Sequence, residues 1–148
     1  MSMAIYPSAV DRRSESSKTV VDIDSWRINV PDQSTLLDRI LCDVRARQSG
    51  TVFTLNLDHL AKLRHDRAFR EAYRRARHVS ADGMPVVLLA RAEGAAIERV
   101  TGADLIEPLC RVAAMARVPV YFFGTGTSVL DRAIARLKEM FPDLIVAG

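Results

Sequence analysis

The chain has 148 residues, of which 49% are hydrophobic and 26% charged, so it can form one globular domain and is neither disordered nor fibrous. The net charge of +3 permits an anionic partner, and aromatic residues at 6% are too few for the stacking platforms that bind single-stranded nucleic acid. No apolar run approaches the ~20 residues of a membrane span. Two isolated cysteines, Cys42 and Cys110, predict reduced, packed thiols.

The N-terminal part predicts a leader, a hairpin and a helix. Residues 1–18 are rich in serine and charge and show no periodicity, which predicts a flexible leader. Residues 19–30 predict two short strands or a hairpin. Asp32 then precedes apolar residues at the helical period, and Gly50 closes this segment.

From residue 52 onward the expected elements alternate between apolar strands and helices. They are strands at 52–57, 77–80, 120–123 and 144–147, and helices at 58–76, 84–92, 104–116 and 128–140. This alternation predicts an α/β fold with a largely parallel sheet flanked by helices. We expect one domain over residues 19–148, incomplete at its C-terminus because the last residue directly follows a strand.

Two polar residues, Thr54 and Asn56, interrupt the first of these strands at a spacing that puts both side chains on one face. Ligands of open α/β sheets bind outside the carboxyl ends of the strands, so the pair is a candidate for contacting a substrate. Alternatively, Thr54 packs as a β-branched residue and Asn56 satisfies the start of the next helix. The residues alone leave both interpretations open.

Asp82 and Gly83 directly precede the helix expected at residues 84–92. The helix dipole favours an ionised carboxylate, which a general base for a hydroxyl group requires, and a glycine lets the substrate approach closely. Asp-Gly is also a common turn pair, so ordinary turn or capping chemistry is the alternative.

Arg99 lies in a charged loop ahead of the helix expected at residues 104–116. A bidentate contact from its guanidinium would neutralise a diphosphate leaving group. The alternative is a solvated charge paired with Glu98. We expect Asp104 to act as a helix cap.

Gly124, Thr125 and Gly126 lie between a predicted strand and a predicted helix, as in a phosphate-binding turn. Val129 occupies the third glycine position of GxGxxG, so the dinucleotide fingerprint is incomplete. Glycines that serve only tight packing of the strand against the helix are the alternative.

A stripe of arginines recurs at three- and four-residue spacing from the helix expected at 58–76: Arg67, Arg70, Arg74 and Arg77. It predicts a solvated helix face or, alternatively, a surface attracted to anionic lipid or a lipid-linked diphosphate. Asp22 and Asp24 form a DxD pattern too short to be specific, and the histidines lack metal-ligand spacing. We predict neither a metal nor a cofactor.

Four blocks and their spacing, taken together, resemble one family: T-L-N at 54–56, A-D-G-M-P at 81–85, E-R-V-T-G-A-D-L at 98–105 and F-F-G-T-G-T-S at 122–128. From about residue 20 to its end, the chain resembles the bacterial WecG/TagA/CpsF glycosyltransferases, glycosyltransferase family 26. The resemblance implies a Rossmann-like fold. Family members continue beyond the last strand seen here, so we expect a C-terminally truncated member.

The resemblance also implies an activity: inverting transfer of a hexosyl or N-acetylhexosaminyl group from a UDP-sugar to a polyprenyl-diphosphate-linked acceptor. This reaction serves exopolysaccharide or other cell-surface polysaccharide synthesis and needs no metal. Carried over by motif, Asp82 is the catalytic base, Thr54 and Asn56 contact a sugar, Arg99 helps hold the diphosphate and the Gly124 turn lies beside the UDP.

The resemblance implies a cytoplasmic enzyme that associates peripherally with the inner face of the plasma membrane. It implies no nucleic-acid partner, and a homo-oligomer is possible. The residues themselves leave two alternatives: a non-catalytic nucleotide-binding module, or a purely structural interaction domain. Tight binding of a UDP-sugar without transfer would favour the module, and no binding would favour the interaction domain.

Overall fold

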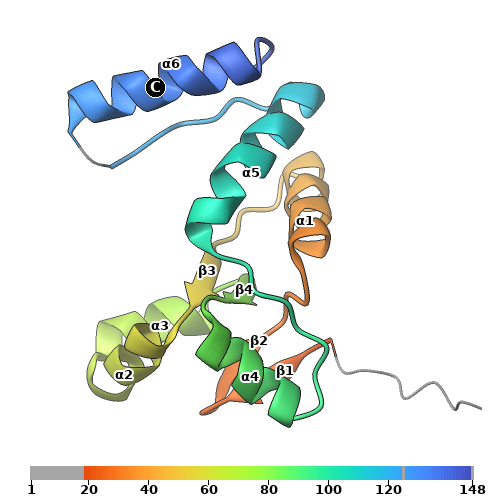
Figure 1. Ribbon diagram of the computed structural model, residues 1–148, viewed down its shortest axis with the longest axis vertical. Helices are drawn as coiled ribbons and strands as arrows, with labels where there is room; N and C mark the ends of the chain where they lie inside the picture. The colour runs from red at the N-terminus through yellow and green to blue at the C-terminus, as the bar shows by residue number, and fades with distance from the viewer. Residues whose placement is uncertain (1–18, 125, 148) are drawn as a thin grey trace, which may run out of the picture.

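The computed structural model describes residues 19–124 and 126–147, so the predicted leader, Thr125 and Gly148 lie outside it. Four short strands and six helices make up this part of the chain (Figure 1). In order they are β1 (Val21–Ile23), β2 (Trp26–Ile28), α1 (Gln33–Arg45), β3 (Val52–Leu55), α2 (Leu57–His65), α3 (Arg67–Arg74), β4 (His78–Ala81), α4 (Met84–Ala92), α5 (Gly102–Ala116) and α6 (Thr127–Met140).

The first two strands form the predicted hairpin. β1 and β2 pair antiparallel, with Ile23 opposite Trp26. Asp24 and Ser25 connect them with φ angles of 49° and 69°. Two successive positive φ values are typical of the tight turn whose twist matches that of a hairpin. The hairpin prediction is confirmed.

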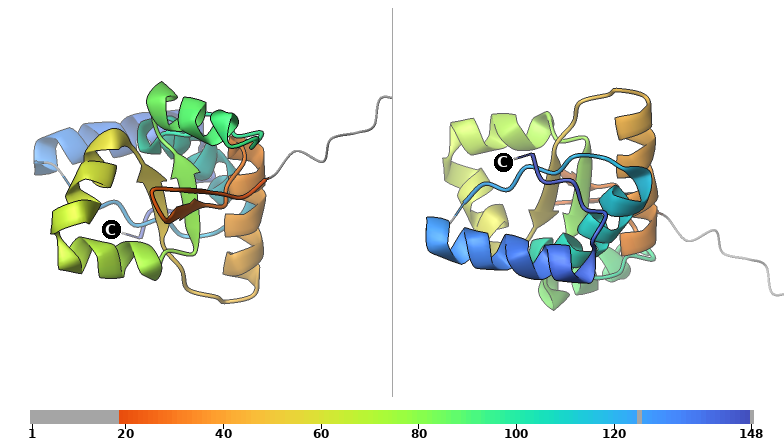
Figure 2. Two further views of the ribbon diagram at one scale, coloured as in Figure 1. Left: turned by 90° about the horizontal axis from the view of Figure 1, so that it is seen from below. Right: turned by 90° about the horizontal axis from the view of Figure 1, so that it is seen from above.

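The centre of the fold is the parallel pair β3 and β4, in which Thr54 lies opposite Ser80 and Leu55 opposite Ala81. Figure 2 shows α1 on one side of this pair and α2 with α3 on the other. The main apolar core packs around the pair and includes Leu55, Leu60 and Leu63 together with residues of the hairpin and α4. The mixed α/β, Rossmann-like fold with an N-terminal hairpin is confirmed.

The helix expected at residues 58–76 is two helices. Asp66 ends α2 and caps α3, because its carboxylate accepts a hydrogen bond from the Phe69 N–H at 2.9 Å. The arginine stripe is divided as a result. Arg70 donates to backbone carbonyls of α2, and Arg77 lies beyond α3 and donates to Asp43 at 2.6 Å. The prediction that the four arginines form one continuous helix face is therefore wrong.

A proline lies inside α5 without breaking it. Pro108 has no N–H to donate to the carbonyl of Asp104, four residues earlier. The Gln33 side-chain amide donates to that carbonyl instead, at 3.1 Å. This bond replaces the missing helical one and ties α1 to the start of α5.

The C-terminal strands are much shorter than predicted. In place of strands at 120–123 and 144–147, the chain forms a single parallel bridge between Val120 and Val146. This segment packs on the C-terminal half of α5, around Cys110, and stands apart from β3 and β4 (Figure 1). Among residues 19–124 and 126–147, no strand lies beside this bridge to extend it into a ladder, and Phe123 stays 94% exposed.

Two further expectations concern single side chains and the membrane. Both cysteines are free, as expected, but only Cys110 is buried, so the predicted packing of Cys42 is wrong. Within the described ranges, no helix is long and apolar enough to cross a membrane.

Candidate functional site

The carboxyl ends of β3 and β4 bring several of the predicted site residues together. Thr54 lies on β3, Asn56 directly follows that strand, and Asp82 directly follows β4. The Asp82 N–H donates to the carbonyl of Leu55 at 2.7 Å, which continues the ladder by one bond. The two strand ends therefore hold Asp82 next to the Thr54–Asn56 segment.

Thr54 is partly buried and faces the start of α5. A Cβ atom built on Gly102, the first residue of that helix, would lie 3.9 Å from the Thr54 hydroxyl oxygen. Thr101 caps α5 by accepting a hydrogen bond from the Asp104 N–H at 3.1 Å. The expectation that Asp104 is the cap is therefore wrong: it lies in the first helical turn.

Asn56 is the N-cap of α2. Its side-chain oxygen accepts a hydrogen bond from the His59 N–H at 2.8 Å, so the structural alternative weighed for this residue is realised. The bond occupies one acceptor of the amide and leaves its NH₂ group available for other contacts. A role in capping and a contact to a ligand are compatible.

Gly83 begins α4 with a φ angle of +90° and ψ of 143°, a backbone region that is essentially restricted to glycine. No side chain caps this helix, and Pro85 occupies its second position. The first N–H groups of α4 thus lack a side-chain acceptor, and the positive end of its dipole lies beside the Asp82 carboxylate.

Arg99 lies alongside the end of β4. Ala81 and Arg99 form a parallel bridge, and the Val100 N–H donates to the carbonyl of Ala81 at 2.8 Å. The Arg99 guanidinium pairs with Asp104 at 3.1 Å instead of with Glu98, so the predicted pair is wrong. Both side chains are about half exposed. An exposed ion pair of this kind is worth only about 0–1 kcal/mol and yields readily to an anionic ligand.

The buried Tyr73 pairs with the partly buried His59, and this pair was not predicted as part of the site. The Tyr73 hydroxyl and His59 Nδ1 are 2.7 Å apart, and Tyr73 stacks on Phe53 at a centroid distance of 4.7 Å. Burial, and secondarily the negative charge of Asp82, raise the pKa of Tyr73 well above its usual range. The phenol therefore stays protonated beside the carboxylate. Tyr73 recurs with Leu60 and Leu63 on an apolar stripe, which in sequence indicates only a core position.

These groups are a carboxylate beside an uncapped helix start, a guanidinium in an exposed ion pair and polar side chains at the strand ends. Residues 21–148 match the model of the glycosyl transferase WecG/TagA/CpsF family. The chain belongs to this family. The match spans most of the sequence and includes all four blocks whose spacing carries the resemblance. Membership supports a glycosyltransferase role in polysaccharide synthesis.

In this WecG/TagA/CpsF family member, the predicted phosphate-binding turn at residues 124–126 does not lie in the cluster formed by the other predicted site residues. In the part of the chain that the structure describes, nothing lies within 4 Å of a Cβ atom built on Gly124 or Gly126, so no packing there requires a glycine at either position. Gly124 has a φ angle of +133°, which explains a glycine there by backbone conformation. The turn belongs to the segment that packs on the far half of α5 (Figure 1), and Thr125 lies outside the described residues.

The two carboxylates of the DxD pattern, Asp22 and Asp24, form ion pairs with arginines on the surface of the hairpin. Asp22 pairs with Arg27 at 3.6 Å, and Asp24 pairs with Arg64 at 3.2 Å. Among the residues that the structure describes, no three His, Cys, Asp or Glu side chains form a group able to hold a metal ion.

Proposed function

We propose that this chain forms the catalytic α/β domain of an inverting glycosyltransferase that moves a sugar from a UDP-sugar to a polyprenyl-diphosphate-linked acceptor. The reaction serves bacterial exopolysaccharide or other cell-surface polysaccharide synthesis, on the inner face of the plasma membrane. The observation that carries the proposal is the meeting of Thr54, Asp82 and Arg99 at the carboxyl ends of β3 and β4, in a chain of this family.

In the proposed reaction, the Asp82 carboxylate takes the proton from an acceptor hydroxyl group. The acceptor oxygen attacks the anomeric carbon of the donor sugar while the bond from that carbon to the UDP oxygen breaks, and UDP leaves with the electron pair. A single displacement inverts the configuration. Asp82 directly precedes Gly83 and the first turn of α4, so its carboxylate is the group proposed to accept the proton.

The departing UDP carries the charge that the remaining groups would stabilise. Arg99 can exchange its exposed partner Asp104 for the diphosphate, and Gly83 brings the first N–H groups of α4 within reach of an anion. Thr54 and the free amide hydrogens of Asn56 would orient a sugar hydroxyl. The Gly124–Gly126 turn is proposed as the neighbour of UDP on the basis of its motif alone.

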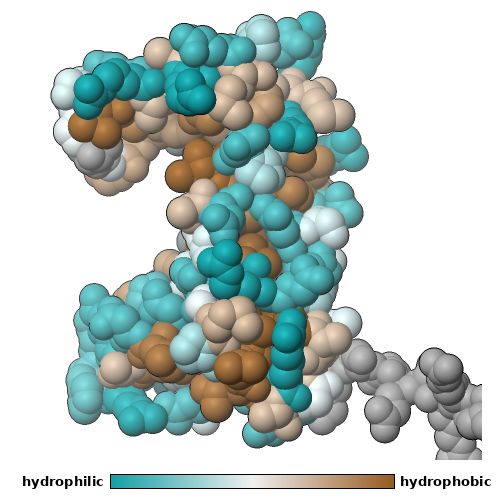
Figure 3. Space-filling model, viewed as in Figure 1, coloured by the Kyte–Doolittle hydropathy of each residue, from teal (hydrophilic) through white to brown (hydrophobic). Residues whose placement is uncertain are grey.

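An apolar surface beside these groups fits a lipid-linked acceptor. α4 begins directly after Asp82 and Gly83, and it exposes Leu88 by 58% and Leu89 by 46%. Figure 3 shows this apolar surface over α4. Exposed leucines on the helix that follows Asp82 would allow a prenyl chain or the membrane surface to approach while the sugar reaches Asp82.

The test is the Asp82→Asn variant, assayed for sugar transfer with a UDP-sugar and a polyprenyl-diphosphate-linked acceptor. Loss of a general base is expected to reduce the rate about 10²- to 10⁴-fold, while UDP binding measured by calorimetry persists. Asp58→Asn, which neutralises an exposed carboxylate in the first turn of α2, is the matched control and should keep the rate. An Asp82→Asn variant with native turnover would exclude Asp82 as the base. UDP binding without transfer in the unmodified chain would favour a nucleotide-binding module.

A further inference from the structure

The ion pair between Arg99 and Asp104 borders a hollow of about 550 Å³ at the start of α5, and both side chains line that hollow. The volume lies within the range of about 300–1,000 Å³ that is typical of small-molecule sites. A Cβ atom built on Gly102, the first residue of α5, would lie 3.9 Å from the Thr54 hydroxyl oxygen, so this end of α5 lies beside β3. A ligand in the hollow would therefore meet Arg99 and Asp104 together, near the proposed reacting groups.

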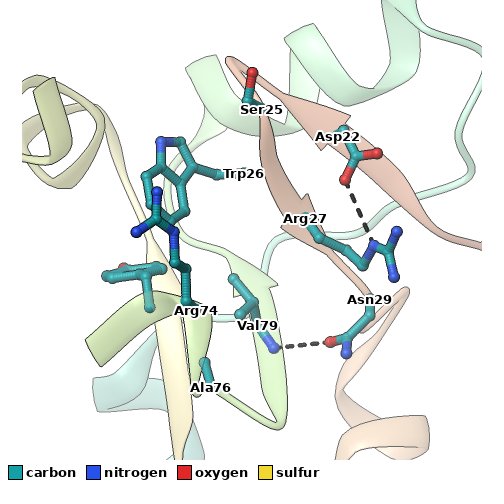
Figure 4. Close-up of a pocket in the computed structure, with 9 residues that line it drawn as sticks. Asp22, Ser25, Trp26, Arg27, Asn29, Arg74, Ala76 and Val79 are labelled. Atoms are coloured by element: carbon teal, nitrogen blue, oxygen red, sulfur yellow. Dashed lines mark hydrogen bonds and ion pairs between the residues drawn. The ribbon is translucent and has the colours of Figure 1, made fainter. Parts of the chain in front are cut away.

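Secondary structure alone does not explain this ion pair. For comparison, Asp22 and Arg27 lie opposite each other on β1 and β2, and their contact, drawn as a dashed line in Figure 4, follows from the strand register. Arg99 precedes α5, whereas Asp104 lies in its first turn. Neither a strand register nor a helical spacing thus joins Arg99 to Asp104, and their contact is a feature of the site itself.

The two partners differ in how firmly they are held. The Asp104 N–H donates to the Thr101 hydroxyl oxygen, and the Asp104 carbonyl accepts from the Gln33 amide, both at 3.1 Å. Its backbone is thus fixed on both sides, and its side chain is short. Arg99 is anchored through its backbone, in the bridge with Ala81, and its long side chain is 48% exposed. The guanidinium can therefore move to another acceptor while the carboxylate stays in place.

An anion that reaches the Arg99 guanidinium also meets the Asp104 carboxylate. A single contact joins the two side chains, from Arg99 Nη2 to Asp104 Oδ2 at 3.1 Å. A bidentate contact to a diphosphate needs two parallel N–H bonds from the guanidinium, and Asp104 occupies the nitrogen of one of them. Like charges that are brought together repel each other. The carboxylate therefore opposes diphosphate binding whether or not Arg99 leaves it.

We propose that Asp104 is a positioning residue that competes with the diphosphate for Arg99 and so keeps the affinity of the site for UDP low. This inference rests on the proposed function, in which Arg99 stabilises the diphosphate of the leaving group. Weak binding of UDP favours turnover, because product release limits the rate of many enzymes.

The test is calorimetry with UDP on the full chain and its variants. Asp104→Asn removes the charge at nearly constant size and should tighten UDP binding about three- to tenfold, an effect that shrinks at high salt. In an Arg99→Gln background, the same substitution should change the affinity less than about twofold, because the group for which Asp104 competes is gone. Asp104→Ser removes the same charge and should show the same gain, so the test does not depend on one variant.

Glu107→Gln is the matched control. Glu107 lies on α5, lines the same hollow and is as exposed as Asp104, but it pairs with Arg111. This variant should bind UDP within about twofold of the native affinity. Asp104→Glu keeps the charge and should also stay near the native affinity. Circular dichroism spectra identify any variant that does not fold, and a purely structural role of Asp104 would weaken UDP binding in Asp104→Asn.

Native or weaker UDP affinity in folded Asp104→Asn and Asp104→Ser would overturn the proposal. The same gain in the Arg99→Gln background, or in Glu107→Gln, would also overturn it, because net charge and not Arg99 would then be the cause. If the native chain binds UDP but transfers no sugar, only the proposed function fails. Native sugar transfer with unchanged UDP affinity in Asp104→Asn contradicts only the role of Asp104, and a native chain that does not bind UDP contradicts both.

Discussion

The two roles of Asn56, as a helix cap and as a contact to a sugar, can be separated by two substitutions. Asn56→Ala removes the oxygen that accepts from the His59 N–H at 2.8 Å. Loss of an N-cap side chain costs about 1 kcal/mol, within a range of about 0.5–2. Asn56→Asp keeps an acceptor at the same place and adds a negative charge at the helix N-terminus, which stabilises by about 0.3–1 kcal/mol. Asp58 already lies in the first turn of α2 and repels the added charge, so we expect the stabilisation to lie near the lower limit of this range.

The assay is urea unfolding followed by circular dichroism, with sugar transfer measured on the same samples. Asn56→Ala should lower the free energy of unfolding by about 1 kcal/mol at an unchanged urea dependence, and Asn56→Asp should equal or exceed the native value. If the amide also donates to a sugar, both variants lose transfer, because Asp lacks the NH₂ group. Native stability in Asn56→Ala would refute the capping argument, and native transfer in Asn56→Asp would refute the sugar contact.

Two further predictions concern the backbone and acid stability. Gly83→Ala should destabilise by about 1–3 kcal/mol in urea unfolding because its φ of +90° disfavours a side chain. Gly126→Ala, at φ −77° with open space, should cost at most about 1 kcal/mol, the loss of a glycine at the N-cap of α6, and equal effects would contradict this. The Arg77 and His78 hydrogen bonds lower the pKa of Asp43 from 3.8 to about 2, so its contribution to stability is complete above pH 4 and is lost as the pH falls toward 2. Asp43→Asn should make the free energy of unfolding depend less on pH between about pH 4 and pH 2. If this dependence is unchanged in the variant, the hydrogen bonds of Asp43 do not cause it.

The sequence predicted local features well wherever one short segment determines them. Positive φ at Asp24 and Ser25 needs only the hairpin turn itself, and the start of α1 follows from the Asp32 side chain, which accepts from the Thr35 N–H at 2.8 Å. Side-chain capping also explains why the prediction of one helix over residues 58–76 was wrong at Asp66. Its carboxylate can cap a new helix, so an apolar period that continues across it does not mean one continuous helix.

The candidate site was predictable in part. Thr54 was singled out as a polar residue in a strand, Asp82 as the residue ahead of a helix and Arg99 as a cation in a loop. The pairing of β3 with β4 and the bridge from Ala81 to Arg99 bring these three segments together. The ion pair between Arg99 and Asp104 was missed because it depends on Thr101, and not Asp104, capping α5. Tyr73 was missed for a different reason: an apolar stripe shows that a tyrosine is buried, but not which polar group its hydroxyl meets.

The segment after α5 shows why an apolar pattern alone does not make a strand. Val120 and Val146 have the β-branched side chains that strands favour, and they lie opposite each other in a parallel bridge. Its two hydrogen bonds run from the Val120 N–H to the Ile145 carbonyl at 2.8 Å and from the Ala147 N–H to the Val120 carbonyl at 2.9 Å. A ladder needs a neighbour along its whole length, and β3 and β4 bond to each other and not to this segment. Tyr121 and Phe123 consequently remain 67% and 94% exposed. The step from apolar pattern to sheet therefore depends on which strand lies alongside, and a single segment does not carry that information.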